Sequence, residues 1–167
     1  PIACANLPYN ITTPVLTRLI ESGLFASITV MIQREVALRI CAAPGTADYG
    51  AFSVFCQYHT QPELLFDVGP ECFLPAPKVT SAVLRLIPRR EPPQTLVDEA
   101  LFFRVVRASF AQRRKTLLNG LSSAFGAQVG KQALRQAIEA AGLPPDVRGE
   151  RLGIAEFAAV AAAIQTT

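Results

Sequence analysis

The sequence contains very few of the residues from which metal sites and histidine-based catalytic sites are built. Its 167 residues include one histidine, one methionine and no tryptophan. A zinc centre needs several His or Cys ligands in close spacing, and a nucleophilic triad needs a histidine base. We therefore expect no metal ion, and we interpret the lone His59 as an ordinary surface or half-buried residue.

The sequence also lacks any cysteine pattern that would indicate a disulfide scaffold. Its four cysteines stand at positions 4, 41, 56 and 72, and no pair has metal-finger spacing. A chain of this length can bury a sizeable core without covalent cross-links. We predict reduced thiols in a cytoplasmic protein.

Long apolar runs and leader segments are missing too. No stretch of about 18 uninterrupted apolar residues occurs, so we expect no membrane span. The segment Pro1–Asn6 has no initiator methionine and no basic region before an apolar one, so we do not expect a signal peptide. It reads as the middle of a strand, and we expect the chain to be part of a longer protein.

A glycine-rich phosphate loop is a further absence. The ten glycines are scattered among predicted turns, and none follows a first strand in the spacing of a dinucleotide-binding loop. No acidic residue closes a second strand in the position that would hold a ribose. The sequence therefore has no recognisable nucleotide-binding half.

Charge is scarce and unevenly placed. Charged residues make up 17% and apolar residues 50%, which excludes disorder as a description of the whole chain. Residues 1–77 contain three Lys or Arg against six Asp or Glu, whereas residues 78–167 contain thirteen against seven. The basic second part favours a polyanionic partner, most simply nucleic acid.

The first part of the chain alternates between strand and helix patterns. Residues 2–5 and 27–32 have the apolar composition of buried strands. Between them, Thr13 as N-cap and Pro14 at the first helical position predict a helix that ends at Gly23. This order is typical of a parallel α/β sheet.

Further elements complete the expected sheet and lead into a linker. We expect helices over 34–42 and 51–58 and a strand hairpin made of 63–68 and 81–87, joined by a proline-rich loop. Residues 89–95 are rich in proline and are predicted to be a linker.

The remainder of the chain has helical periodicity. The first of its helices places Val97, Leu101 and Val105 on one apolar face. Four helices are expected, over 96–111, 115–124, 128–141 and 154–164, and the second of them is expected to end near Gly126. We therefore predict two domains, an α/β segment over 1–90 and a small helical domain over 91–167.

The segment Asn6-Leu7-Pro8-Tyr9 follows the first predicted strand, at the sheet edge where α/β proteins bind ligands. The exocyclic amine of a base is a poor nucleophile because its lone pair is delocalised into the ring. The Asn6 side-chain oxygen and the Leu7 carbonyl can accept its two N–H groups, Pro8 stiffens the turn, and Tyr9 offers a stacking surface. From these four residues alone, an ordinary turn is the alternative.

A basic stretch near the middle of the helical part is the second candidate site. It contains five cations and no acid: Arg104, Arg107, Arg113, Arg114 and Lys115. If one helix ran through it unbroken, all but Arg113 would share a face. The absence of interleaved acids favours phosphate contact, and a solvated charged face is the alternative.

The motif at residues 6–9 resembles motif IV of adenine-amine methyltransferases, in the form found in the ribosomal RNA adenine dimethyltransferases. Further matching segments cover essentially the whole chain in order: 10–14, 33–40, 44–50, 73–83, 103–117 and 148–157. The resemblance is closest to the bacterial type that acts on 16S ribosomal RNA.

This resemblance implies an enzyme that uses S-adenosylmethionine to dimethylate N6 of two adjacent adenosines in the 3′-terminal hairpin of 16S rRNA, linked to assembly of the small ribosomal subunit. It implies that Asn6 and the Leu7 carbonyl hold the amine and that Asn6 borders the cofactor. It also implies that Tyr9 and Phe73 sandwich the flipped base, while Lys78 contacts phosphate or only closes its loop. A monomer without metal is expected.

The fold that the resemblance implies is the C-terminal half of a Rossmann-like class I methyltransferase domain, followed by a small all-helical domain that binds RNA. Because the glycine-rich half is missing, we expect the chain alone to be inactive and to bind S-adenosylmethionine weakly or not at all. Two alternatives stay open: a non-catalytic rRNA-binding assembly module, and a resistance-type dimethylase acting on 23S rRNA.

Overall fold

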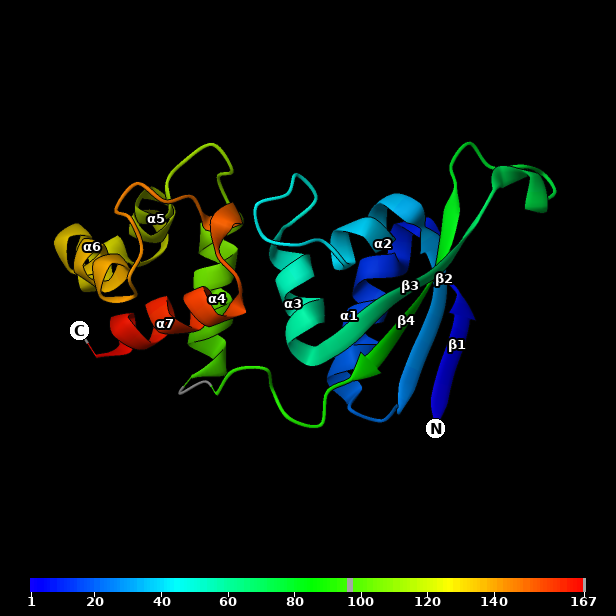
Figure 1. The fold of residues 1–167 in the computed structure, drawn as a ribbon, viewed down its shortest axis with the longest axis horizontal. Helices are drawn as coiled ribbons and strands as arrows, with labels where there is room; N and C mark the ends of the chain where they lie inside the picture. Colours follow the sequence, from blue (N-terminus) through cyan, green and yellow to red (C-terminus); the bar gives the residue numbers. More distant parts are fainter. Residues whose placement is uncertain (96–97, 167) are drawn as a thin grey trace. The chain divides into compact units, whose positions relative to one another are not determined.

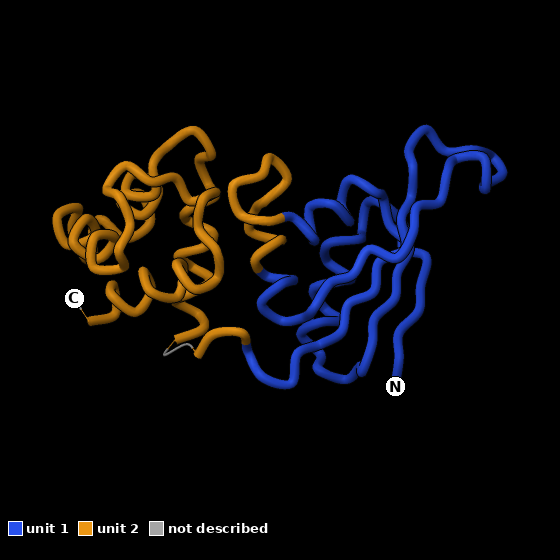
Figure 2. The backbone as a smooth tube through the Cα atoms, in the orientation of Figure 1, with its two compact units in different colours: residues 1–42, 55–92 blue, residues 43–54, 93–167 orange. Residues whose placement is uncertain are grey.

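The structure is a computed structural model in which residues 1–95 and 98–166 are described. It divides into two compact units (Figure 2). The first consists of Pro1–Ala42 and Phe55–Pro92, and the second of Ala43–Val54 and Pro93–Thr167. Residues 43–54, which the sequence analysis places with the α/β segment, thus pack with the C-terminal helices.

The first unit contains a four-stranded mixed sheet (Figure 1). Its strands are β1 (Ile2–Asn6), β2 (Ser27–Gln33), β3 (Thr60–Val68) and β4 (Ser81–Pro88), in the spatial order β1-β2-β4-β3. β1 runs parallel to β2, with Ala5 opposite Val30, and β4 pairs antiparallel with both β2 and β3. The chain therefore has a mixed α/β fold.

Alternating side chains build the core of this unit. Every second residue of β2 is buried, so Ile28, Val30 and Ile32 point to one side of the sheet. Buried residues of α1 (Thr12–Ser22) and α2 (Arg34–Ile40) add Leu16 and Ile40 to the core. The helix α2 packs against β2, β3 and β4.

The start of α1 differs from the expectation. Thr13 is not the N-cap, because the 3-10 turn η1 (Tyr9–Ile11) leads directly into a helix that begins at Thr12. The Thr12 hydroxyl donates to the Pro8 carbonyl at 3.0 Å. Pro14 is the third helical residue, still within the first turn, where the missing N–H costs no hydrogen bond. The helix end at Gly23, with φ of 65°, is confirmed.

The strand expected over 63–68 is longer in the structure. The helix α3 (Ala51–His59) passes directly into β3 at Thr60, so the strand includes Pro62. Proline donates no ladder hydrogen bond, and it is tolerated here because β3 lies at the end of the sheet. The loop between β3 and β4 contains the short 3-10 turn η2 (Pro70–Cys72).

The second unit contains four α-helices and one 3-10 turn among its described residues after position 97. They are α4 (Glu99–Phe110), α5 (Leu117–Val129), α6 (Lys131–Ala140), η3 (Gly149–Arg151) and α7 (Ile154–Gln165). The expected helix start at Leu96 and the apolar position Val97 lie outside the described residues.

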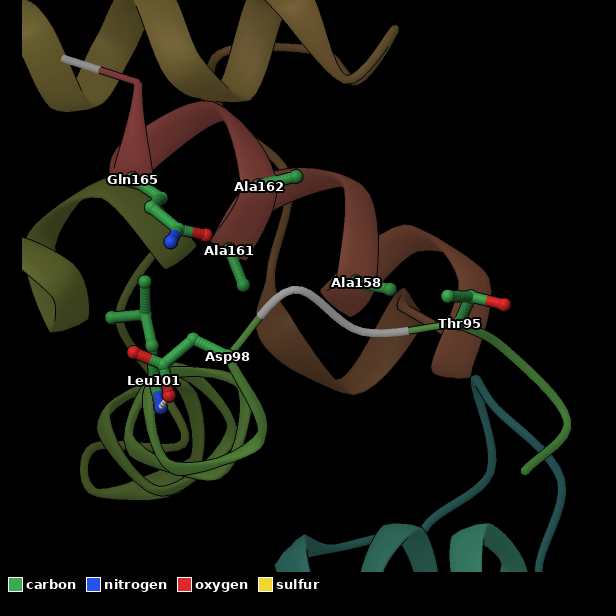
Figure 3. Close-up of a pocket in the computed structure, with 7 residues that line it drawn as sticks. All are labelled: Thr95, Asp98, Leu101, Ala158, Ala161, Ala162 and Gln165. Carbon is green, nitrogen blue, oxygen red and sulfur yellow. Dashed lines mark hydrogen bonds between the residues drawn. The ribbon is translucent and has the colours of Figure 1, made fainter. Parts of the chain in front are cut away.

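A side-chain cap fixes the beginning of α4. The Asp98 carboxylate accepts the Leu101 backbone N–H at 3.0 Å (Figure 3). A small hollow of about 30 Å³ between α4 and α7 adjoins this cap, with Ala158 and Ala161 in its wall. It is far too small for a nucleotide. No helix of the described segments is both long and apolar enough to cross a membrane.

The boundary between α5 and α6 corrects the expected one. α5 was predicted to end near Gly126, yet it continues to Val129, and α6 begins at Lys131 instead of 128. Gly126 lies inside the helix with no heavy atom closer than 4.0 Å to an added Cβ. The break falls at Gly130, whose φ of 85° lies in the left-handed region.

Candidate active site

The end of β1 positions the four-residue motif. Asn6 is the last residue of the strand, opposite Met31 of β2. The Leu7 N–H donates to the Met31 carbonyl at 3.1 Å, and its side chain is buried. Pro8 then turns the chain into η1. The backbone around the Leu7 carbonyl is thus held by the sheet on one side and a proline on the other, while Asn6 stays exposed.

Tyr9 is anchored through its hydroxyl group. Its Oη lies 2.8 Å from Oγ of Ser81, the first residue of β4, which is almost fully buried. Tyr9 as a whole residue remains 40% exposed. This hydrogen bond fixes the ring while leaving part of its face accessible. Ser81 could not be identified as a site residue from the sequence, because its contact with Tyr9 spans 72 positions along the chain.

A hollow gathers the motif and the proline-rich loop, and we call it the β1 hollow. Its volume is about 330 Å³, and it is lined by Asn6, Leu7, Pro8, Tyr9, Phe73, Pro75 and Pro77. Phe73 therefore lies beside the motif although more than sixty residues separate them in sequence. Lys78 is exposed and is not part of the lining.

The lining of the β1 hollow is electrically neutral. Its polar side chains are one amide and one phenol, and its other members are aromatic, proline or leucine. Such a site can accept and donate hydrogen bonds and can stack on a flat ring. Among residues 1–95 and 98–166, no group of three or more His, Cys, Asp and Glu side chains could hold a metal ion.

The basic stretch does not form one helical face. α4 ends at Phe110, and residues 111–116 form a turn region before α5, so the arrangement expected from an unbroken helix does not occur. Arg107, Arg114 and Lys115 are exposed. Within the described part of the chain, no side-chain hydrogen bond or ion pair involves these three residues.

Two members of the stretch make internal contacts instead. The Arg104 guanidinium lies 4.2 Å from the centre of the Phe125 ring and donates to the Ala124 carbonyl at 2.9 Å. Arg113 donates to the carbonyls of Ala47 and Tyr49, each at 3.0 Å. Both residues thereby tie segments of the second unit together. The sequence could not reveal these acceptors, because they are backbone groups.

Tyr49 is the centre of the contact between residues 43–54 and the helices. Its hydroxyl donates to the Leu152 carbonyl at 2.8 Å, and its ring packs edge-on against Phe110. Burial, together with the nearby Glu156 carboxylate, raises the pKa of Tyr49 to about 12. Burial also raises the pKa of the Cys41 and Cys56 thiols, which makes both poor nucleophiles at neutral pH.

Comparison with known proteins identifies the family of this chain. The profile of the family described as Ribosomal RNA adenine dimethylase matches residues 2–160. The chain belongs to the ribosomal RNA adenine dimethylase family. The family membership expected from the sequence motifs is therefore confirmed.

Two relatives of known description are similar along almost the whole chain. The Ribosomal RNA small subunit methyltransferase A of Geobacillus kaustophilus is 46% identical over 162 residues, and the one of Streptococcus pneumoniae is 49% identical over 163. These alignments cover 96% of this chain but 55% and 56% of the relatives. The chain thus spans about half the length of the curated relatives it matches.

Two solved structures share the fold of this chain. A dimethyladenosine transferase from Plasmodium falciparum superposes with a TM-score of 0.80 at 23% identity, covering 95% of this chain and 64% of that one. The 23S rRNA methyltransferase ErmE gives a TM-score of 0.67 at 20% identity, covering 98% and 65%. At these identities the likeness supports the α/β fold.

Proposed function

We propose that this chain supplies the substrate-binding half of an enzyme that dimethylates adenosine N6 in 16S rRNA of the small ribosomal subunit, with S-adenosylmethionine as methyl donor. The observation that carries the proposal is the β1 hollow, in which Asn6, Tyr9 and Phe73 line one space. The family membership and the names of the relatives point to the same reaction.

The proposed mechanism begins with the target amine. The Asn6 side-chain oxygen and the Leu7 carbonyl accept its two N–H groups and turn the nitrogen lone pair out of conjugation with the ring. Tyr9 and Phe73 hold the flipped base between their rings, and the Ser81 contact keeps Tyr9 in place. As the new N–C bond forms, the nitrogen becomes cationic and acidic, so it releases its proton to solvent without a strong base.

S-adenosylmethionine supplies a methyl group bonded to a sulfonium, which leaves as a neutral thioether when the methyl is transferred. The described residues fit one border of a donor site, because the exposed Asn6 amide stands at the carboxyl end of a parallel strand beside the β1 hollow. The chain has no glycine-rich loop to hold the rest of the donor.

We further propose that the first unit is the second half of a Rossmann-like class I methyltransferase domain and that the C-terminal helices form an RNA-binding domain. β1 lies at the end of the sheet, and Ile2 is 73% exposed. Both features suit a sheet that continues into further strands. The predicted division at residues 90 and 91 remains part of this proposal.

RNA contacts are proposed for four exposed cations whose side chains form no hydrogen bond or ion pair within the described residues: Arg107, Arg114, Lys115 and Lys78 of the proline-rich loop. Arg104 and Arg113, expected from the sequence to bind RNA, are assigned here to the packing of the second unit. Phosphate contacts of this kind position the RNA, whereas the β1 hollow selects the base.

The proposal is tested by methyl transfer from labelled S-adenosylmethionine to ribosomal subunits that lack the modification, with the full-length protein that contains this chain. Small subunits should accept label on adenosine, and large subunits should not. Label in 23S rRNA alone would establish the resistance-type alternative. Tight binding to small subunits without any transfer would establish the non-catalytic assembly module.

A further inference from the structure

A second hollow lies in the helical part of the chain, and we call it the α5–α6 hollow. Its volume is about 300 Å³, far more than the roughly 10–15 Å³ that admits one water molecule. It is lined by Thr116, Leu118, Asn119, Lys131, Arg135, Pro145 and Asp146. The start of α5, one face of α6 and the loop after α6 therefore line this open hollow, in a part of the unit where the two helices pack together (Figure 1).

Two cations without partners face this space. Lys131 and Arg135 are four residues apart on α6, so they lie on the same side of the helix. Both are exposed, and within the described residues neither forms a hydrogen bond or an ion pair through its side chain. Like charges at this spacing repel each other, so their pairing does not serve the stability of the helix.

Lys131 lies at an electrostatically unfavourable position of α6. It is the first residue of α6, where the helix dipole carries positive partial charge and disfavours a cation. Neither α5 nor α6 has an acidic residue in its first turn. Asp146 is the one carboxylate among the lining residues. The lining of the α5–α6 hollow therefore carries a net positive charge, and this charge does not stabilise the helices that bear it.

The acid-free run in the sequence extends further than the basic stretch itself. Between Glu99 and Glu139 there is no Asp or Glu. The run contains seven cations: Arg104, Arg107, Arg113, Arg114, Lys115, Lys131 and Arg135. Lys131 and Arg135 thus belong to the same acid-free run as the exposed cations before α5. A run of this kind favours a polyanionic partner.

We propose that Lys131 and Arg135 bind a backbone phosphate of RNA in the α5–α6 hollow, as a contact additional to Arg107, Arg114 and Lys115. The inference rests on the proposed function for its RNA partner. Arg135 offers a planar fork that matches phosphate oxygens, and Lys131 adds a point charge. The polar side chains of Thr116 and Asn119 at the start of α5 line the same space. A contact of this kind positions RNA without reading its sequence.

The test compares the salt dependence of RNA binding by the full-length protein and its variants, using a labelled hairpin with the sequence of the 16S 3′ terminus. Loss of the one neutralised phosphate in Lys131→Ala/Arg135→Ala should make the slope of log Kobs against log salt shallower by about 0.7–0.9. Asp146→Asn should tighten binding, because it removes a repelling carboxylate from the lining.

Two matched variants separate the site from net charge and from folding. Gln132→Glu/Gln136→Glu lowers the charge of the same helix by the same two units at exposed positions outside the lining, and it should leave a steeper slope than the alanine pair. Lys131→Arg/Arg135→Lys keeps both charges and should retain the wild-type slope.

The outcomes also separate this inference from the proposed function. A steep wild-type slope that the alanine pair does not change more than the glutamate pair would overturn the phosphate site and leave the enzyme proposal standing. A wild-type protein whose RNA binding shows no salt dependence would overturn the phosphate site as well. Methyl transfer to small subunits by the same preparation then shows whether the enzyme proposal stands.

Discussion

At the scale of single residues, the hydrogen bond between Tyr9 and Ser81 joins the motif after β1 to the start of β4. It gives a polar anchor to a ring whose remaining surface is left for a ligand. Such an anchor restricts the ring to one orientation, which lowers the entropic cost of stacking on a base. The Phe73 side chain has no polar group to fix its ring. Its ring can therefore reorient more freely than that of Tyr9.

The two rings therefore respond differently to truncation. Tyr9→Phe should keep stacking and lose the anchor, with unfolding free energy lowered by about 1 kcal/mol. Phe73→Ala should leave stability nearly unchanged and lower kcat/KM by about 5- to 150-fold, the range of one lost base–aromatic contact. Denaturant unfolding and methyl-transfer kinetics of the full-length protein measure both effects. Equal losses of activity in Phe73→Ala and Phe73→Tyr would contradict stacking.

Arg113 and Arg114 are neighbours in sequence with different expected roles. Arg113→Ala removes two hydrogen bonds to the carbonyls of Ala47 and Tyr49, so the free energy of unfolding should fall by about 1–3 kcal/mol. Arg114→Ala should not change stability, and it should make the salt slope of RNA binding shallower by about 0.7–0.9. Thermal unfolding beside RNA titrations separates the two. If Arg113→Ala made the salt slope shallower and Arg114→Ala lowered stability, Arg113 would be the residue that contacts RNA.

We expect the stability of the protein to depend on pH through Tyr49. Its pKa is raised in the fold from 10.0 to about 12, so the neutral phenol is favoured by folding. The contribution of Tyr49 is fully present below about pH 10 and is lost as the pH rises towards 12. Unfolding free energies between pH 8 and 12 should fall more steeply for the wild type than for Tyr49→Phe. Parallel curves would show that the phenol does not titrate with folding.

At the scale of elements, the contact of α4 with α5 depends on Gly120. A Cβ at this position would lie 2.7 Å from the Ala108 carbonyl oxygen of α4. Because that neighbour is backbone, it cannot move aside without shifting the helix. Gly126, six residues later in α5, has room for a methyl group.

These two glycines give a matched pair of substitutions. Gly120→Ala should lower the free energy of unfolding by about 1–3 kcal/mol through overpacking. Gly126→Ala should raise it by about 0.5–1 kcal/mol, because alanine restricts the unfolded chain and suits a helix interior. Denaturant melts of the two variants decide the point. A stable Gly120→Ala variant would mean that α4 and α5 are not packed this closely.

The same elements show what could be predicted from the sequence. The alternation in β2 and the stop at Gly23 were sufficient to place a strand and a helix end, because each depends on local residues. The end of α5 was misplaced, since Gly126 and Gly130 look alike in sequence and only the fold requires a left-handed φ at one of them. The strand through Pro62 was missed because its edge position is a tertiary property.

The candidate site likewise contains some residues that the sequence indicates and others that only the fold reveals. Asn6–Tyr9 and Phe73 could be proposed from motif chemistry and family resemblance, and the structure places them around one hollow. Ser81 and the carbonyl acceptors of Arg113 and Arg104 could not, because a hydroxyl or a backbone oxygen carries no signal until the fold brings it within reach.

At the scale of the whole molecule, we propose that the chain supplies the base-binding side of the reaction, while its sequence contains no glycine-rich loop for the donor. It covers about half the length of its relatives. The 167-residue chain should therefore show no measurable heat of S-adenosylmethionine binding under conditions that saturate the full-length protein. Saturable binding by the chain alone would mean that its own residues complete the donor site.

We propose that Asn6 activates the target amine and does not merely shape the β1 hollow. The most direct measurement is the single-turnover rate of methyl transfer by full-length wild type and Asn6→Ala at saturating small subunits, with the Kd for the subunit measured beside it. We predict a rate at least about 100-fold lower for Asn6→Ala with an unchanged Kd. An unchanged rate, or a loss that weaker subunit binding fully accounts for, would contradict it.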